Sequence, residues 1–206
     1  GYPHISYHDW NNEDLKYATN KAKAWQTYIV DSEGDVGSYN SIAVDADGYL
    51  HISYRDDTNE DLKYATNESG SWQTYTIDSA GDVGWYTSIA VDSDGHVHIS
   101  YYDLDNDDLK YATNESGSWQ IYIIDSDGVV GKYTSIAVDS DGYVHISYYD
   151  FSNYDLKYAT NKAKAWQTYT IDSDGMVGEY TSIAIDSDGY VHISYFDHTN
   201  EDLKYA

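Results

Sequence analysis

The stretch "DSDGYVHISYYDFSNYDLKYATN" occupies residues 139–161, and close copies of it recur along the whole chain. Within it, the apolar side chains of Val144 and Ile146 alternate with the polar side chains of His145 and Ser147. This period of two is typical of a β-strand. Asp-Gly precedes the strand and "FSNY" follows it, and both are rich in residues that favour turns. The stretch therefore predicts two short strands joined by a turn.

The copies of this stretch are spaced evenly. The histidine of "HIS" recurs every 47 residues, at His4, His51, His98, His145 and His192. The tryptophan of "WQ" has the same spacing, at Trp25, Trp72, Trp119 and Trp166. One period contains four short β-rich segments, such as residues 143–150, 155–161, 166–172 and 180–186, and no helical periodicity.

Four short strands in a unit of about 40–50 residues are typical of a blade of a β-propeller. A β-solenoid is the competing interpretation, but its rungs are usually shorter. We name the strands of one blade A ("SIA"), B ("HIS"), C ("LKY") and D ("WQ"), and we expect A to be innermost because of its small Ser and Ala residues. The sequence predicts an all-β fold, a β-propeller of four-stranded blades.

The number of blades follows from the count of strands. The chain opens at strand B and ends after strand C, which gives eighteen strands in one domain, 1–206. Five periods would need 235 residues, so 29 residues, one D-plus-A unit, are missing from a five-bladed ring. Five blades with one incomplete junction is the simplest interpretation. A ring of four blades and a fragment of a larger propeller are the alternatives. The expected blades span residues 1–37, 38–84, 85–131, 132–178 and 179–206.

The composition excludes several classes of partner. The formal net charge of −25 argues against nucleic acid and anionic membranes, which bind basic patches. There is no cysteine, and no apolar run approaches the roughly 18 residues of a membrane span. The many Tyr, Ser, Thr, Asn and Asp residues favour an extracellular or cell-surface protein. We expect no cofactor.

The repeated motifs "VDSDGYVHISYYD" and "DLKYATNESGSWQ" resemble those of highly repetitive bacterial β-propellers of surface and secreted proteins. More distantly, they are similar to blades of fucose-binding and tachylectin-type lectins. The resemblance covers all 206 residues and implies the fold, but propellers serve many functions. The sialidase Asp-box is not matched, because no tryptophan follows "SDG" at the required spacing.

Substitutions between the copies concentrate at one end of the predicted blades. The A–B turn reads "DADG" once and "DSDG" three times, and the C–D loop has only two versions, "KAKA" and "ESGS". The B–C and D–A loops, which share the other end of an up-and-down sheet, vary much more, and many of their changing residues are large and apolar. We predict that this variable face binds a ligand. The candidate ligand-binding residues are His8, Trp10, Arg55, Asp57, Trp85, Tyr102, Leu104, Val129, Tyr149, Phe151, Tyr154, Met176, Phe196 and His198.

Metal binding has weaker support. The turn "AVDSDG" (90–95) resembles the start of a calcium loop, but its first ligand position is Ala90 and only Asp92 and Asp94 remain. The five "HIS" histidines occupy equivalent places in different blades, so a repeated structural hydrogen bond is the better interpretation. The lysine after each "DL" is expected to pair with a loop aspartate, for example Lys16 with Asp9.

Catalysis is also disfavoured. A catalytic centre needs a unique constellation, whereas every carboxylate motif here is repeated four or five times. A sialidase would need several arginines, and Arg55 is the only one.

The sequence therefore predicts a non-enzymatic recognition propeller that binds a protein or glycan on its variable face. One alternative is a multivalent lectin with repeated pockets between blades, built from residues such as Asp56, Tyr64, Asn67 and Trp72. Another is a structural repeat of a surface fibre or array, assembled into homo-oligomers through unpaired strand edges.

Overall fold

The computed structural model describes all residues from 1 to 206 and contains eighteen β-strands in five antiparallel sheets, without a helix. Each sheet is a meander in which strands consecutive in the sequence are neighbours. The strands are, sheet by sheet, β1 (His4–Asp9), β2 (Asp14–Thr19) and β3 (Gln26–Asp31); β4 (Val36–Val44), β5 (Leu50–Asp56), β6 (Asp61–Thr66) and β7 (Gln73–Asp78); β8 (Trp85–Val91), β9 (Val97–Asp103), β10 (Asp108–Thr113) and β11 (Gln120–Asp125); β12 (Val130–Val138), β13 (Val144–Asp150), β14 (Asp155–Thr160) and β15 (Gln167–Asp172); β16 (Val177–Ile185), β17 (Val191–Asp197) and β18 (Asp202–Tyr205).

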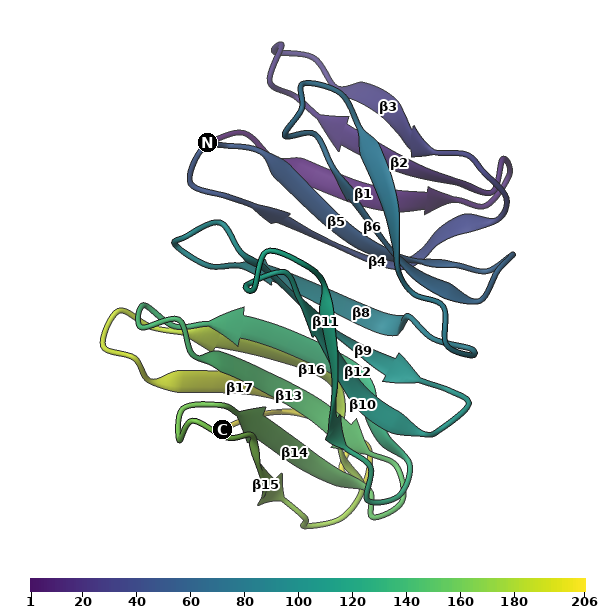
Figure 1. The fold of residues 1–206 in the computed structure, drawn as a ribbon. Helices are drawn as coiled ribbons and strands as arrows, with labels where there is room; N and C mark the ends of the chain where they lie inside the picture. The colour runs from purple at the N-terminus through teal and green to yellow at the C-terminus, as the bar shows by residue number, and fades with distance from the viewer.

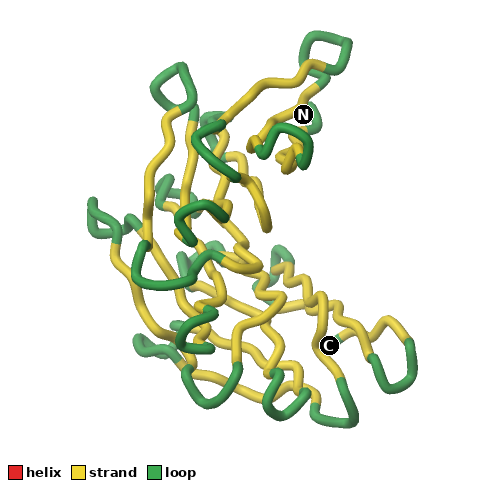
Figure 2. Tube along the Cα trace, turned by 90° about the vertical axis from the view of Figure 1, so that its right-hand side faces the viewer, coloured by secondary structure: helices red, strands yellow, loops and turns green.

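These five sheets confirm the predicted repeat of short four-stranded units. The first sheet lacks strand A and the last lacks strand D, so both have three strands. Strands β4, β8, β12 and β16, which are the A strands, contact one another in succession, so strand A is innermost as expected. The sheets follow one another along an open arc, and the two chain ends lie on either side of its opening (Figure 2). The arrangement is propeller-like, but the ring is open in this structure.

The hydrophobic cores lie between neighbouring sheets. The first core joins Leu15 and Tyr17 of sheet 1 to Ile52 and Tyr54 of sheet 2, and equivalent cores fill the next two interfaces. The core between sheets 4 and 5 is smaller. Because interior sheets are covered on both faces, β5, β9 and β13 are buried along their whole length, and β1 at the end of the arc is not.

A repeated polar framework connects each strand B to its surroundings. Nδ1 of His98 is 2.6 Å from the hydroxyl of Tyr111, and its Nε2 is 3.2 Å from Asp92. The other four "HIS" histidines make the same contact with a tyrosine of strand C, so the predicted structural role is confirmed.

The lysines of strand C do more than expected. Lys110 contacts the loop aspartate Asp103 at 3.0 Å, as predicted, but it also donates to Asp78 of the preceding sheet at 2.8 Å. The hydroxyl of Tyr101 donates to the same Asp78 carboxylate at 2.7 Å. Lys110 and Tyr101 therefore link their sheet to the preceding one through Asp78. The predicted lysine–aspartate pairs did not include this link.

None of the elements is a helix long and apolar enough to cross a membrane.

Candidate functional site

The variable loops lie together at one end of the sheets. The B–C turns after β1, β5 and β9 lie on the right in Figure 1, and the A–B turns after β4, β8 and β12 lie on the left. The D–A connections leave on the same side as the B–C turns, because every sheet is an antiparallel meander (Figure 1). This arrangement agrees with the face expected from the sequence.

Backbone hydrogen bonds join the two kinds of loop into a rigid rim. The amide of Asp57 in a B–C turn donates to the carbonyl of Asp35 in the preceding D–A loop at 2.8 Å. The amide of Asp35 in turn donates to Oγ1 of Thr58 at 2.8 Å. Asp105, Ser152 and Thr199 accept the same bond in the other sheets. Each of the four residues at this position therefore supplies an acceptor oxygen. The position varies in residue type but keeps the same structural role.

One cleft opens in this rim where the first three sheets meet, with a volume of about 530 Å³. Its aromatic walls are Trp10, Tyr39 and Trp85, and Trp10 is 81% exposed. The polar residues that line it are His8, Asp35, Ser38 and Asp57. The structure thus brings together four of the predicted site residues: His8, Trp10, Asp57 and Trp85.

The cleft also concentrates unsatisfied polar atoms. Four buried side-chain polar atoms in the chain have no hydrogen-bond partner, and they are both ring nitrogens of His8, Oδ1 of Asp35 and Oγ of Ser38. Nε2 of His8 is 3.1 Å from Oδ1 of Asp35, which is an ionic contact without hydrogen-bond geometry. Because Nε2 of His8 and Oδ1 of Asp35 face each other, the atoms left without a polar contact are Nδ1 of His8 and Oγ of Ser38. Buried polar groups are nearly always paired in native proteins, so these atoms are available to a polar ligand.

Arg55 lies beside the cleft and contacts two of the residues that line it, Asp57 and Trp85. Its guanidinium contacts Asp57 at 2.8 Å and Asp82 at 2.7 Å, and it donates to the carbonyl of Val83 at 2.7 Å. It also lies over the ring of Trp85, 4.6 Å from the centroid. The indole nitrogen of Trp85 donates to Asp82 at 2.5 Å, so this ring is held from two sides. Arg55 is buried and positions Trp85 and Asp57.

A tyrosine ladder extends from the cleft along the inner strands. Tyr39, Tyr86, Tyr133 and Tyr180 contact one another in order, with ring centroids 4.9, 4.7 and 4.4 Å apart. All four have positive φ, between 47° and 54°, a conformation that is uncommon and costly for an aromatic residue. The sequence-based prediction missed Tyr39 because this tyrosine is the same in all four copies. The signal was the constant "Y" two residues after Gly37 and its equivalents.

The remaining predicted residues do not reach the cleft. Phe151 and Tyr154 are exposed and form a second patch, with their centroids 5.8 Å apart and the Lys132 ammonium 4.1 Å above the Phe151 ring. Leu104 and His198 are exposed on other turns of the same rim. Val129, Met176 and Phe196 are half-buried in the D–A loops and at the end of β17.

Two predicted residues, Tyr102 and Tyr149, point inward. Each is 1% exposed, because the residue after "HISY" still belongs to the B strand and lies under the next sheet. The hydroxyl of Tyr102 donates to Asp107. Burial raises the pKa of Tyr149 to about 12, with the charge of Glu179 adding to the effect. The expectation that these two rings face a ligand is therefore corrected, and the same correction applies to Arg55.

The residues of the multivalent-lectin alternative are mostly engaged in the framework. Tyr64 is buried and contacts His51, Asp56 holds the turn at Asn59, and Asn67 accepts from the amide of Leu50 at 2.8 Å. Trp72 and Asn67 do line a small cavity of about 270 Å³ between sheets 1 and 2, at the constant end.

The weak calcium candidates form a hydrogen-bonded turn. Oδ1 of Asp92 accepts from the amides of Asp94 and His96, and its Oδ2 contacts the rings of His96 and His98. Asp94 is exposed. A cation would have to displace these bonds.

No family model and no curated protein matches the sequence. The fold does resemble solved structures. A protein of unknown function from Dyadobacter fermentans superposes with a TM-score of 0.64 at 10% identity, over 98% of this chain and 77% of that one. The lectin of Aleuria aurantia in complex with Fucα1-6GlcNAc gives 0.64 at 13% identity, over 99% and 74%. A Hadza microbial sialidase gives 0.58 at 12% identity, over 96% and 51%. At such low identity these likenesses establish an all-β, propeller-like fold shared by lectins and glycosidases.

Proposed function

We propose that this chain is a non-enzymatic recognition module that binds a carbohydrate in the cleft of His8, Trp10, Tyr39 and Trp85. The observation that carries the proposal is the coincidence of aromatic walls with buried polar atoms of His8, Asp35 and Ser38 that make no hydrogen bond. Sugars present apolar C–H faces and several hydroxyls, so they suit a cleft of rings and unpaired donors and acceptors. The fold likeness to a lectin supports the same ligand class.

The charge of the protein narrows the ligand to a neutral saccharide. The chain carries a net charge of −25, and the cleft itself contains Asp35 and Asp57. Its only arginine, Arg55, is buried and already engaged by Asp57 and Asp82. A sialylated or sulfated glycan would meet repulsion without a free cation to offset it. A neutral glycan on a larger macromolecule meets no such penalty.

The carboxylates of the cleft are poorly suited to glycoside hydrolysis. A general acid needs a carboxyl group whose pKa is raised by an apolar or anionic setting. Asp57 is instead paired with Arg55, and Asp35 lies against His8. The carboxyls whose pKa burial does raise are Asp61, Asp108 and Asp155, which occupy one repeated framework position. We therefore propose binding without catalysis, in a secreted or cell-surface protein.

The test is binding to an array of neutral and sialylated glycans, followed by calorimetry with the best neutral ligand. Replacing Trp10 and Trp85 together by Ala should weaken binding by about a hundredfold, because aromatic side chains that a ligand covers contribute on the order of 1–2 kcal/mol each. The circular dichroism spectrum should not change, since both rings lie on loops or at a strand end.

Trp25→Ala is the matched control, because Trp25 is also an exposed tryptophan but lies at the constant end of the sheets. It should bind like the unmodified protein. Equal losses in both variants, or preference for sialylated glycans, would contradict the proposal. Several identical sites in calorimetry that ignore the Trp10 and Trp85 changes would support the multivalent alternative instead.

A further inference from the structure

The second aromatic patch of the variable face, around Phe151 and Tyr154, contains a cation without an ionic partner. The chain has 36 Asp and Glu side chains against 11 Lys and Arg, and most of these cations form an ion pair. Lys132 forms none, although its side chain is half-buried. Lys132 is the one buried or half-buried cation without a carboxylate partner, because the other lysines that form no ion pair are exposed in the constant loops, namely Lys21, Lys23 and Lys164.

Aromatic rings take the place of a carboxylate around Lys132. Its ammonium lies 4.1 Å from the centroid of the Phe151 ring and 5.5 Å from that of the Tyr102 ring. Contacts of this kind stabilise a positive charge. An ammonium group also has three N–H donors, and ring faces leave these free for the oxygen atoms of a ligand.

Exposed apolar surface continues from Lys132 along the rim. Phe151 is 44% exposed and Tyr154 is 41% exposed, and the centroids of their rings are 5.8 Å apart. The buried ring of Tyr149 packs against Phe151, with 6.2 Å between the centroids. These residues belong to sheets 3 and 4, each of which has four strands and a neighbouring sheet on both sides.

The repeat relates this patch to the cleft where the first three sheets meet. Lys132 and Phe151 are the equivalents, two repeats further on, of Ser38 and Asp57, which line the cleft. Both positions are polar in the cleft, whereas in the patch one is cationic and the other aromatic. The same place on the rim therefore suits a ligand of different chemistry, in which a negative charge lies next to an apolar group.

Glu179 restricts the kind of anion that can approach. It is the equivalent of Lys132 in the next sheet, and the two side chains form no ion pair. Burial raises the pKa of Tyr149, and the nearby charge of Glu179 adds to this effect. An anionic ligand is attracted by Lys132 and repelled by Glu179, which favours a single carboxylate over a ligand with several negative charges.

We propose that Lys132, Phe151 and Tyr154 bind the C-terminal residue of a polypeptide whose last side chain is apolar. The α-carboxylate accepts hydrogen bonds from the Lys132 ammonium, and the side chain covers the exposed rings. In a C-terminal residue the carboxylate and the side chain are attached to the same Cα atom, which matches an ammonium group that lies directly over a ring. Capture of a C-terminal carboxylate is a recurring mode of peptide recognition.

An acidic saccharide suits this patch less well. Its hydroxyl groups need hydrogen-bond partners, whereas Phe151 and Tyr154 expose mainly ring surface beside Lys132. The net charge of −25 also disfavours polyanionic chains. A polypeptide C-terminus brings one negative charge together with an apolar side chain.

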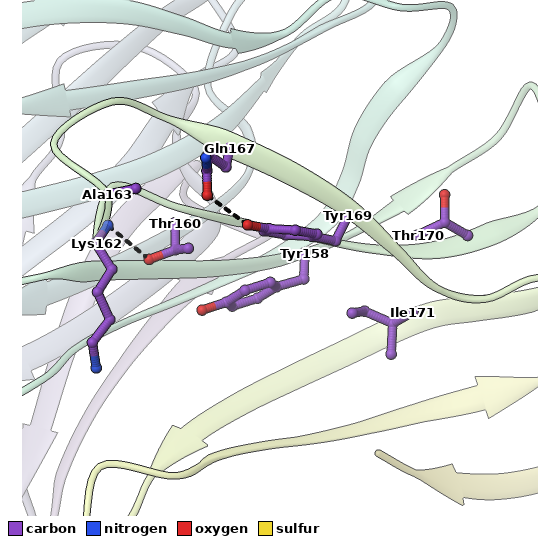
Figure 3. Close-up of a pocket in the computed structure, with 8 residues that line it drawn as sticks. All are labelled: Tyr158, Thr160, Lys162, Ala163, Gln167, Tyr169, Thr170 and Ile171. Atoms are coloured by element: carbon purple, nitrogen blue, oxygen red, sulfur yellow. Dashed lines mark hydrogen bonds between the residues drawn. The ribbon is translucent and has the colours of Figure 1, made fainter.

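The constant end of sheet 4 provides a matched lysine. The ammonium of Lys162 lies 5.9 Å from the centroid of the Tyr143 ring, but it also contacts Asp139 at 3.5 Å. Figure 3 shows Lys162 at the edge of the pocket that Tyr158 and Tyr169 line, with its ammonium directed away from the Tyr169 ring. Lys162 thus combines a similar aromatic contact with a carboxylate partner, and we expect it to bind no peptide terminus.

The experiment uses the full chain, isotope-labelled for NMR, and two peptides that differ only at the C-terminus. Both have the sequence acetyl-Gly-Ser-Gly-Phe, one with a free carboxylate and one with an amide. At about 0.15 M salt, where the Debye length of about 8 Å screens long-range repulsion, the free acid should shift the backbone signals of Lys132, Phe151 and Tyr154 saturably. The amide should bind at least about tenfold more weakly, because it lacks the charge-assisted hydrogen bond.

On the protein side, Lys132→Gln should remove the preference for the free acid, and Lys162→Gln should keep it. The amide peptide, which depends on Phe151 and Tyr154, should bind equally to both variants and so report an intact site. Glu179→Gln should tighten binding of the free acid, because it removes a neighbouring negative charge.

Equal binding of the two peptides to the unmodified protein, or a preference that survives Lys132→Gln, would overturn the proposal. So would an equally strong response of the same signals to glucuronic acid, because an acidic sugar would then be the occupant.

Discussion

The two ends of the sheets are built from the same repeats, but they differ in whether their polar side-chain atoms are hydrogen-bonded. At the constant end, the turn aspartates Asp45, Asp92, Asp139 and Asp186 each accept from backbone amides and contact a histidine ring nitrogen at 3.1–3.2 Å. At the variable end, one cleft contains all four unsatisfied buried side-chain atoms.

This difference separates the framework from the surface that we propose binds a ligand. Repetition gives every sheet the same satisfied hydrogen bonds, and a departure from the repeat leaves polar atoms without partners. Ser38 is such a departure, because the equivalent residues are Trp85, Lys132 and Glu179. His8 is another, because the equivalent residues are Arg55, Tyr102, Tyr149 and Phe196. Three predictions test the comparison.

The largest expected effect is a loss of stability in acid, caused by protonation of histidines and aspartates of the repeated framework. Burial lowers the pKa of His98 and of His145, although Asp92 and Asp139 oppose this. Burial alone would raise the pKa of Asp78, but the hydrogen bonds from Lys110 and Tyr101 outweigh it and hold that pKa below 3.8. A lowered native pKa gives stability above the unfolded-state pKa that is lost as the pH falls.

The melting temperature should therefore decline as the pH falls from about 6.5, the unfolded-state pKa of histidine, and collapse once Asp78 and its equivalents are protonated below about pH 4. Thermal melts from pH 8 to pH 3 at about 0.5 M salt, which screens the repulsion among surface carboxylates, measure this. Replacing His98 and His145 by Gln should flatten the upper part of the profile. A melting temperature that rises between pH 7 and pH 5 would contradict the prediction.

A smaller loss of stability is expected on replacing the tryptophan that packs between neighbouring sheets at the constant end. Trp119→Ala removes the edge-on contact with Tyr64 at 5.3 Å and should destabilise the protein by about 2 kcal/mol. Trp25→Ala is the matched change at a repeat position that is exposed and has no ring neighbour, and it should change stability by less than about 0.5 kcal/mol. Urea unfolding of both variants measures the difference. Similar costs would show that burial between sheets does not explain the repeated tryptophan.

The smallest expected effect on stability distinguishes the cleft from the interior framework by its sign. Ser38→Ala removes a buried hydroxyl that has no partner in the cleft, so it should be neutral or stabilising by up to about 1 kcal/mol. Ser100→Ala, by contrast, removes the acceptor of the Thr134 hydroxyl at 2.9 Å and should cost about 1–2 kcal/mol. Melting temperatures of the two Ser→Ala variants suffice. A loss at Ser38 as large as at Ser100 would mean that the cleft is satisfied by ordered water.

Part of this molecule could be predicted from local sequence patterns. The alternation around Ile146, the turn at Gly142 and the period of 47 residues predicted every strand and the role of the repeated histidines. The candidate site was predicted only partly. His8, Trp10, Asp57 and Trp85 share a cleft, while Tyr102, Tyr149 and Arg55 are buried. Variation between copies does not distinguish a residue that changes because it faces a ligand from one that changes because its neighbouring sheet differs.

The sequence by itself determined the strands, their order within each sheet and the end at which variation gathers. These follow from hydrogen bonds and side-chain alternation that involve residues close together in the sequence. Only the tertiary structure decided which of the varying side chains meet, that Tyr39 adopts positive φ, and that the sheets form an open arc. Those properties depend on how one sheet packs against the next, and this packing joins residues about a full repeat apart that no local pattern relates.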